Sequence, residues 1–188
     1  MNVFLDFEAS SLGKKSVPIE VAWVFENGAS ADYLIRPAPG WDDWDARAEA
    51  IHHIDRATLA LHGIAHDVVA ATMVEQLTGH ALFASAPSWD GKWLSALLRA
   101  AGHSRHLLRL QDSDDACRRI AVEALEGFVP PEALAATVED LIGSISVRPP
   151  GVAPAHRALA DAQEDFRRWR AVGDAARRLA ADRARGRI

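Results

Sequence analysis

The stretch VFLDFEASSL, residues 3–12, begins as an apolar run and then places two carboxylates, Asp6 and Glu8, on either side of Phe7. A short apolar run of this kind is typical of a buried strand. Side chains two positions apart on a strand point to the same face, so both carboxylates project from one side of it. Without a cation they would repel and raise each other's pKa, and a hard divalent cation with oxygen ligands removes that cost. The stretch therefore predicts either a metal site on a central strand or solvated acids at a strand end.

The composition is that of a soluble globular protein. The chain has 188 residues, of which 49% are hydrophobic and 25% are charged, and this suits one domain with a sizeable core. The single cysteine, Cys117, excludes an internal disulfide framework and fits a reducing compartment. Neither a signal peptide nor a bilayer-spanning apolar run is visible. We therefore expect a cytoplasmic protein with a single domain over residues 1–188 and no membrane partner.

Charge is distributed unevenly along the chain. The formal net charge is -5, yet residues 156–188 hold nine arginines against five acids, so the rest of the chain is strongly acidic. An acidic body argues against a large, salt-sensitive nucleic-acid footprint. An acidic body does not exclude a compact site that holds a few phosphates through metal ions. The Arg-rich end is expected to be a solvated helix face.

Periodicity and turn signals predict a succession of strands and helices. Further strands are expected over residues 18–25, 31–35, 80–85 and 106–110, with an Asn27-Gly28 hairpin turn between the first two of these. Helices are expected over residues 67–77, 92–101, 113–124 and 131–141, then a loop over 146–154 and a long helix from about residue 155. Three antiparallel strands followed by alternating helices and strands predict an α/β fold. Its mixed sheet would have about five strands flanked by helices on both faces.

Acidic side chains recur at element ends farther along the chain. Asp90 follows the fourth expected strand, and Asp161 lies in the last helix, five residues after His156. At about 100° per residue, His156 and Asp161 would lie about 140° apart around a common helix. His156 therefore fits the loop–helix junction better than the Asp161 face. That placement suits a base that moves onto a bound water.

These motifs, taken in order, resemble those of the DEDD exonuclease superfamily. They are Asp-x-Glu on the first strand, an Asp before a helix with Trp93-Leu94, and His-x4-Asp near the C-terminus. The last motif resembles the His-containing subgroup, which includes polymerase proofreading subunits and oligoribonuclease. Residues 18–22 also look like that family's second strand, and residues 51–54 like its His-containing loop. The resemblance covers residues 2 to about 170 and implies a ribonuclease H-like fold with 3′–5′ hydrolysis of phosphodiester bonds.

The resemblance also implies a role for each matching residue. Two Mg²⁺ or Mn²⁺ ions would be held by four carboxylates, those of Asp6, Glu8, Asp90 and Asp161. Asp6 would bridge both ions, and Asp90 would act largely through water. His156 would take a proton from the attacking water. Stacking and apolar wedging would favour an unpaired 3′ end, with substrate contacts at Phe7, Ala9, Ser10, Leu12, His52 and Trp89.

The sequence departs from the family pattern at two places. Ser85-Ala86 stands where many relatives have His-Asn, and Ser11 stands where many have Gly. The first departure bears on contacts around the scissile nucleotide and leaves the metal ligands in place.

The expected activity is that of a metal-dependent 3′–5′ exonuclease acting on short or single-stranded DNA or RNA. Two alternatives remain, a catalytically silent nucleic-acid-binding module of the same fold and a phosphodiesterase for small nucleotides, and a homodimer is also open. Two of the proposed metal ligands also have a purely structural interpretation. Asp90 could cap the start of a helix, and Asp161 could form an ion pair within its helix. Trp41 and Trp44 would either stack on bases or form a loop that covers the core.

Overall fold

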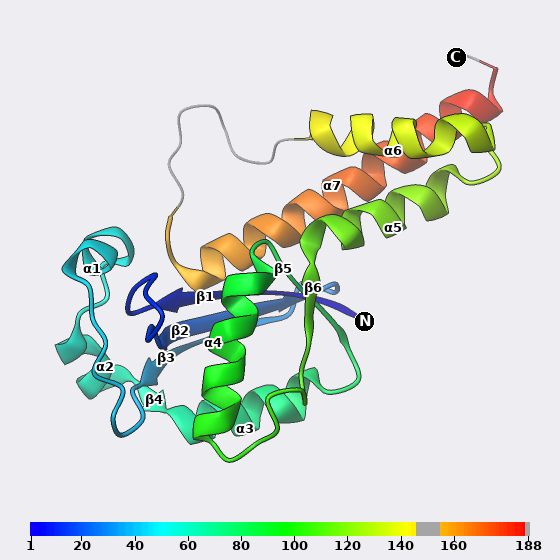
Figure 1. The fold of residues 1–188 in the computed structure, drawn as a ribbon. Helices are drawn as coiled ribbons and strands as arrows, with labels where there is room; N and C mark the ends of the chain where they lie inside the picture. Colours follow the sequence, from blue (N-terminus) through cyan, green and yellow to red (C-terminus); the bar gives the residue numbers. More distant parts are fainter. Residues whose placement is uncertain (146–154, 187–188) are drawn as a thin grey trace.

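Strand β1 lies at the centre of a mixed sheet in the computed structural model, which describes residues 1–145 and 155–186 (Figure 1). Within these residues the sheet has six strands in the order β4-β3-β2-β1-β5-β6. The strands are β1 (Asn2–Ala9), β2 (Pro18–Phe25), β3 (Ser30–Arg36), β4 (Ile64–Ala65), β5 (Ala81–Ala84) and β6 (Leu110–Asp112). The first three are antiparallel, and β4, β5 and β6 each run parallel to the neighbour they join. The expected mixed sheet is confirmed, and the strand beyond the expected five is the short β4.

Helices cover both faces of this sheet (Figure 1). They are α1 (Ala46–His52), α2 (Arg56–His62), α3 (His66–Leu77), α4 (Pro87–Ala100), α5 (Ser113–Leu125), α6 (Pro131–Ser144) and α7 (Ala158–Ala184). None of the described helices is both long and apolar enough to span a membrane.

Alternation along β1 decides which helices lie on which face. The odd-numbered residues Val3, Leu5 and Phe7 belong to a buried cluster with Met73 of α3 and Leu94 of α4. Phe4, an even-numbered residue, packs instead with residues of α5 and α7 in a second cluster. Because side chains alternate between the two faces of a strand, the even positions 6 and 8 also face the α7 side.

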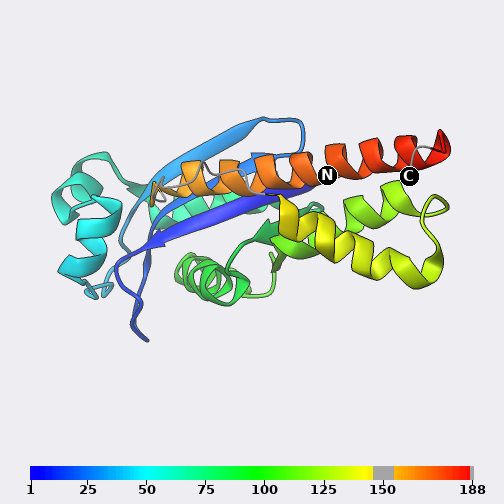
Figure 2. The same ribbon diagram turned by 90° about the horizontal axis from the view of Figure 1, so that it is seen from above.

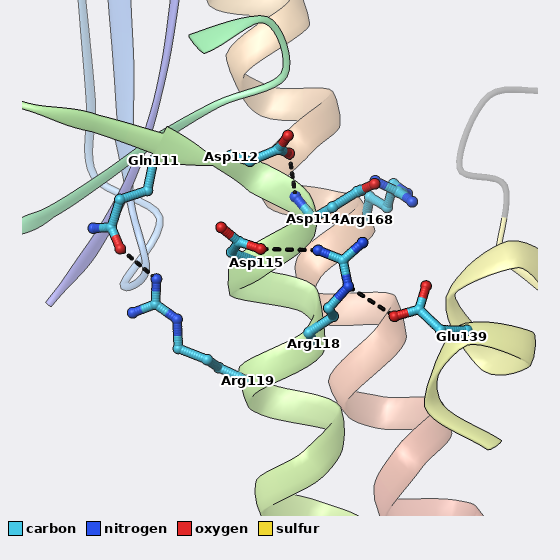
Figure 3. Close-up of polar contacts among 8 residues, drawn as sticks. All are labelled: Gln111, Asp112, Asp114, Asp115, Arg118, Arg119, Glu139 and Arg168. Atoms are coloured by element: carbon cyan, nitrogen blue, oxygen red, sulfur yellow. Dashed lines mark hydrogen bonds and ion pairs between the residues drawn. The ribbon is translucent and has the colours of Figure 1, made fainter. Parts of the chain in front are cut away.

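A third cluster lies where α5, α6 and the second half of α7 pack together. We call these helical segments the arm, and Figure 2 shows that the arm extends beyond the sheet. Polar contacts link its helices, as Figure 3 shows, since Arg118 of α5 pairs with Glu139 of α6 and Asp114 of α5 pairs with Arg168 of α7. The arm thus has its own apolar core and its own surface ion pairs.

Several expected element boundaries are wrong. The last strand is Leu110–Asp112 rather than residues 106–110, because its pairing with β5 sets Leu110 opposite Leu82. Helix α4 begins at Pro87 instead of residue 92, since proline is favoured in the first helical turn. Helix α7 begins at Ala158 instead of residue 155. The loop expected over 146–154 lies outside the described residues.

Two helices were not expected in the polar and aromatic segment that follows β3. The side chain of Asp45 accepts a hydrogen bond from the Arg47 backbone and caps α1, and Asp55 does the same for α2 through Thr58. Such caps stabilise a helix start by satisfying backbone N–H groups that have no partner within the helix. Both helices are only seven residues long, too short to show a clear apolar period.

Candidate active site

Three carboxylates from opposite ends of the chain meet on the α7 side of the sheet. Asp6 and Glu8 project from β1, and Asp161 lies in the first turn of α7. One carboxylate oxygen from each of the three lies within 4.8 Å of the other two. Oxygen ligands in such a cluster are those that Mg²⁺ and other hard divalent cations prefer. The even-numbered face of β1 and the docking of α7 together create this cluster.

Burial and repulsion between neighbouring acids raise the pKa values of the two carboxyls on β1. Burial is the largest cause that raises the pKa of Asp6 well above its ordinary value, and the charges of Asp90, Glu8 and Asp161 raise it further. Burial likewise raises the pKa of Glu8 to about 8, helped by Asp161 and Glu20. Solvated acids at a strand end would lack this desolvation, so the metal-site interpretation of β1 is favoured.

Asp90 lies in the first turn of α4 and is only 2% exposed. Burial is the main cause that raises its pKa to about 7, and the backbones of Phe7 and Ala86 partly offset the rise. The N-cap alternative fails because Ala86 occupies the N-cap position. Among the described residues, the buried Asp90 Oδ2 has no hydrogen-bond partner. A buried carboxylate oxygen without a partner is costly on its own and fits an acid that binds a cation through water.

Asp90 and His156 both lie outside the three-acid cluster of the described residues. The charge of Asp90 nevertheless acts on Asp6 and Glu8. His156 directly precedes α7 with φ of 47°, in the left-handed region that residues other than glycine rarely adopt. Backbone strain of this kind persists only where neighbouring contacts impose it.

The residues that follow His156 are held by Glu20, a buried acid that sequence reasoning missed. Its carboxylate, 2% exposed, accepts hydrogen bonds from Arg157 Nη2 at 2.6 Å and Nε at 3.1 Å and from the Ala158 backbone N–H at 3.0 Å. Glu20 also lies directly opposite Glu8 in the antiparallel register of β1 and β2. It therefore ties the start of α7 to the sheet beside the cluster. A lone acid within the apolar run of β2 was the signal that could have revealed it.

Asp165 is a second acid that sequence reasoning did not assign. It lies four residues after Asp161 in α7, and burial is the main cause that raises its pKa to about 7. Its charge contributes to the raised pKa of both Asp6 and Asp90. The i,i+4 spacing from Asp161, which puts both acids on one helix face, was the available signal.

The expected substrate-contact residues differ in accessibility. Phe7, Ala9 and Ser10 are buried, while the Leu12 side chain is 71% exposed in the β1–β2 loop and Trp89 is 38% exposed on α4. Ser10 and Ser11 both donate hydrogen bonds to Asp43, at 2.8 and 2.6 Å, which fixes the β1–β2 loop.

The two tryptophans and the histidine of the α1 region have partners within the protein. His52 is buried, and its Nδ1 accepts a hydrogen bond from the Ile54 backbone. Trp44 donates to Glu49 and packs beneath the Arg56 guanidinium. Trp41 packs against the core cluster of α3 and α4. These contacts favour the covering-loop interpretation of Trp44, whereas Trp41 is only partly buried and also lines an open cleft.

The raised pKa values predict that the metal-free protein loses stability as pH rises. A carboxyl whose pKa is higher in the folded state favours the fold while protonated, and that contribution is lost between its unfolded and folded pKa values. For Glu8 this window runs from 4.5 to about 8, and for Asp90 from 3.8 to about 7. Melting temperature in EDTA should therefore fall from pH 5 to pH 8. Mg²⁺ at about 100 times its Kd should restore about 5–10 °C at pH 8.

Circular dichroism melts at four pH values, with EDTA or Mg²⁺, would measure this. Glu8→Gln carries no titrating group at that position, so its EDTA profile should be flatter than that of the wild type. A wild-type protein whose melting temperature at pH 8 ignores Mg²⁺ would contradict the metal-site interpretation.

Comparison with known proteins gives a match in structure alone. No protein-family model matches the chain, and no curated protein matches its sequence. The zinc-bound E. coli exonuclease I complex with single-stranded DNA superposes with a TM-score of 0.63 at 18% identity, over 95% of this chain and 41% of that one. E. coli exonuclease I with a dA16 oligonucleotide gives a TM-score of 0.64 at 17% identity, over 96% and 42%. Exonuclease I from Methylocaldum szegediense gives a TM-score of 0.57 at 19% sequence identity, over 89% of this chain and 39% of that one.

These likenesses establish the fold. The mixed sheet with helices on both faces is of the ribonuclease H-like type that the sequence resemblance implied. The chain spans about two fifths of the length of the exonuclease I chains that it matches.

Proposed function

We propose that this protein is a metal-dependent 3′–5′ exonuclease that acts on single-stranded or short nucleic acid. The observation that carries the proposal is the cluster of Asp6, Glu8 and Asp161 on the shared fold, with the buried Asp90 acting on it electrostatically. The similar E. coli exonuclease I binds single-stranded DNA and has been solved with zinc, which supports a substrate and a cofactor of these classes.

The acids of the site suit two divalent cations, Mg²⁺ or Mn²⁺. Asp6, Glu8 and Asp161 would bind them directly, and Asp90 would do so largely through water. When bound, such ions stabilise charge on the attacking and leaving oxygens of a phosphodiester and offset the negative charge of the acids. The residues fit because they supply hard oxygen donors whose burial penalises the charged form unless a cation is present.

The protein's own groups would position the strand and move the proton. His156, at the junction before α7, would accept a proton from the attacking water. The exposed Leu12 side chain would wedge against the terminal base, and the exposed ring of Trp89 offers a stacking surface. Both groups favour an unpaired 3′ end.

Polarity of attack is the direct test of this proposal. A single-stranded oligomer with a 3′-phosphate should resist digestion, whereas the same oligomer with a 5′-phosphate should be shortened from its 3′ end, because the site must receive a free 3′ terminus. Denaturing gels of matched DNA and RNA oligomers with Mg²⁺ or Mn²⁺ would measure this. Asp161→Asn should be inactive, and Asp174→Asn, an exposed site on the same helix, should retain activity. Equal digestion of both oligomers, or internal fragments appearing first, would argue against an exonuclease.

A phosphodiesterase for small nucleotides is the second candidate, favoured by the acidic body of the chain. Turnover of a dinucleotide and a 12-mer separates the two. An exonuclease should process the 12-mer with the higher kcat/KM, and a small-nucleotide enzyme should prefer the dinucleotide.

A further inference from the structure

All three lysines of this 188-residue chain line one cleft of about 690 Å³. Lys14 and Lys15 belong to the β1–β2 loop, and Lys92 belongs to α4. Arg99 adds a fourth cation, and Trp41 contributes an aromatic wall. We call this site the lysine cleft. Its concentration of positive charge contrasts with a chain whose formal net charge is -5.

The lysine cleft is built from the two elements that carry the metal-site acids. The β1–β2 loop continues directly from β1, which bears Asp6 and Glu8. Helix α4 holds Asp90 in its first turn and then presents Lys92, Ala96 and Arg99 to the cleft. That spacing of four and three residues forms one stripe along a helix. The four proposed metal-site acids do not line the cleft, which is connected to them through β1 and α4.

Cations in the lysine cleft remain available to a ligand. In the part of the chain that the structure describes, no carboxylate lies within ion-pair distance of Lys14, Lys15 or Arg99, and all three are exposed. Lys92 has a positioning task, because its Nζ donates to the Gly13 carbonyl at 2.6 Å and to Ser16 Oγ at 2.7 Å.

The acids that line the cleft do not balance its positive charge. Asp42 and Asp43 face the four cations, and Asp43 already accepts hydrogen bonds from Ser10 and Ser11. An anion entering the cleft would therefore meet more positive than negative charge.

We propose that the lysine cleft binds the phosphate backbone of the single strand whose 3′ end enters the active site. This inference rests on the proposed function and adds the path of the strand upstream of the scissile bond. Lysines that neutralise phosphates supply sequence-independent affinity, and an aromatic wall accepts a base by stacking. A cleft of this size is in the range of about 300–1,000 Å³ that holds small ligands, so it fits a short piece of one strand.

The test compares two variants that each remove two exposed cations. Lys14→Ala/Lys15→Ala changes the cleft, and Arg177→Ala/Arg178→Ala changes the arm by the same charge. Fluorescence anisotropy with a labelled oligothymidylate 12-mer in EDTA, at several salt concentrations, would measure Kd without hydrolysis. The cleft variant should bind about tenfold more weakly, and its salt slope should fall by about 1.4, at roughly 0.7 per lost phosphate contact on a single strand. The arm variant should bind like the wild type.

Two further measurements separate phosphate binding from a purely structural role of the loop lysines. Arg99→Gln removes a cation from α4 rather than from the loop, so it should also weaken 12-mer binding even if the loop lysines have a local structural role. In turnover with Mg²⁺, the loss in kcat/KM caused by the cleft variant should be larger for the 12-mer than for a dinucleotide.

Failure of the cleft inference is distinguishable from failure of the proposed function. If the wild type digests the 12-mer from its 3′ end and the cleft and arm variants bind it equally, the cleft inference is overturned and the exonuclease stands. If the wild type does not digest the oligomer but the cleft variant alone loses affinity, the cleft is supported as a nucleic-acid site without turnover. If the cleft and arm variants lose the same affinity for the 12-mer, the effect comes from the overall charge of the protein and the inference is overturned.

Discussion

Asp6→Asn should abolish turnover and raise the melting temperature of the metal-free protein. Asp6 lies on the central strand, within the cluster that includes Glu8 and Asp161, and burial raises its pKa well above its ordinary value. Replacing this carboxyl with a neutral amide of similar size removes a buried negative charge and its repulsion with neighbouring acids. The apo fold should therefore gain stability, with about 2–4 °C for each kcal/mol relieved in a chain of this size.

The same substitution removes one of the carboxylates that would hold the proposed cations. A loss of at least about 10³-fold in rate is expected, equivalent to about 4 kcal/mol of barrier. The measurement is turnover of a 3′-labelled oligomer by protein stripped with EDTA and then restored with Mg²⁺, together with a melt in EDTA. Asp140→Asn, at an exposed position of α6, is the matched control and should change neither quantity. Wild-type hydrolysis by the restored Asp6→Asn protein would show that the two-metal proposal is wrong.

His156→Ala should lower the rate of the chemical step by about 10²–10⁴-fold, or about 3–5 kcal/mol of barrier. The attacking water has to lose a proton, and His156 is the histidine next to the helix that carries Asp161. Metal affinity should be retained because all four carboxylates remain. The loss should shrink at high pH, where hydroxide replaces the missing base.

Backbone strain at His156 calls for a second variant. The residue has a φ of 47°, a conformation that asparagine tolerates better than alanine does. If the alanine variant is slow only because the backbone has shifted, His156→Asn should recover activity, whereas loss of a base should leave both variants slow. Single-turnover pH–rate profiles under saturating Mg²⁺ would measure this, with His62→Ala on α2 as a control histidine. A His156→Ala protein that equals the wild type at pH 7 would exclude His156 as the base.

The alternation of β1 explains why so much could be predicted from the sequence. An apolar run with acids two apart is a local pattern, and it placed Asp6 and Glu8 on one face of a buried strand before any tertiary contact was known. The hairpin between β2 and β3 also follows from a local signal, Asn27-Gly28. The order of strands and helices along the chain then indicated the layered sheet.

The features that were missed depend on partners distant in sequence. The apolar residues 106–110 looked like a strand by themselves, but the register with β5 places the pairing at Leu110–Asp112, which includes two polar residues. Glu20 gains its role from Arg157 and Ala158, 137 and 138 positions away. The sequence pattern within β2 does not indicate that Glu20 would bind these two residues. The seven-residue helices α1 and α2 depend on single capping aspartates and on packing, so local propensity was too weak to predict them.

The position of Asp161 has a consequence for the newly made chain. A ribosome that has released β1 has delivered Asp6 and Glu8, but Asp161 and the Glu20 partner Arg157 follow only with α7. At about 5–20 residues per second, the acid cluster stays incomplete for on the order of ten seconds of synthesis. A growing chain that has not yet reached α7 therefore lacks the assembled acid cluster. Because one acid lies on α7, assembly of the cluster depends on the synthesis and docking of that helix.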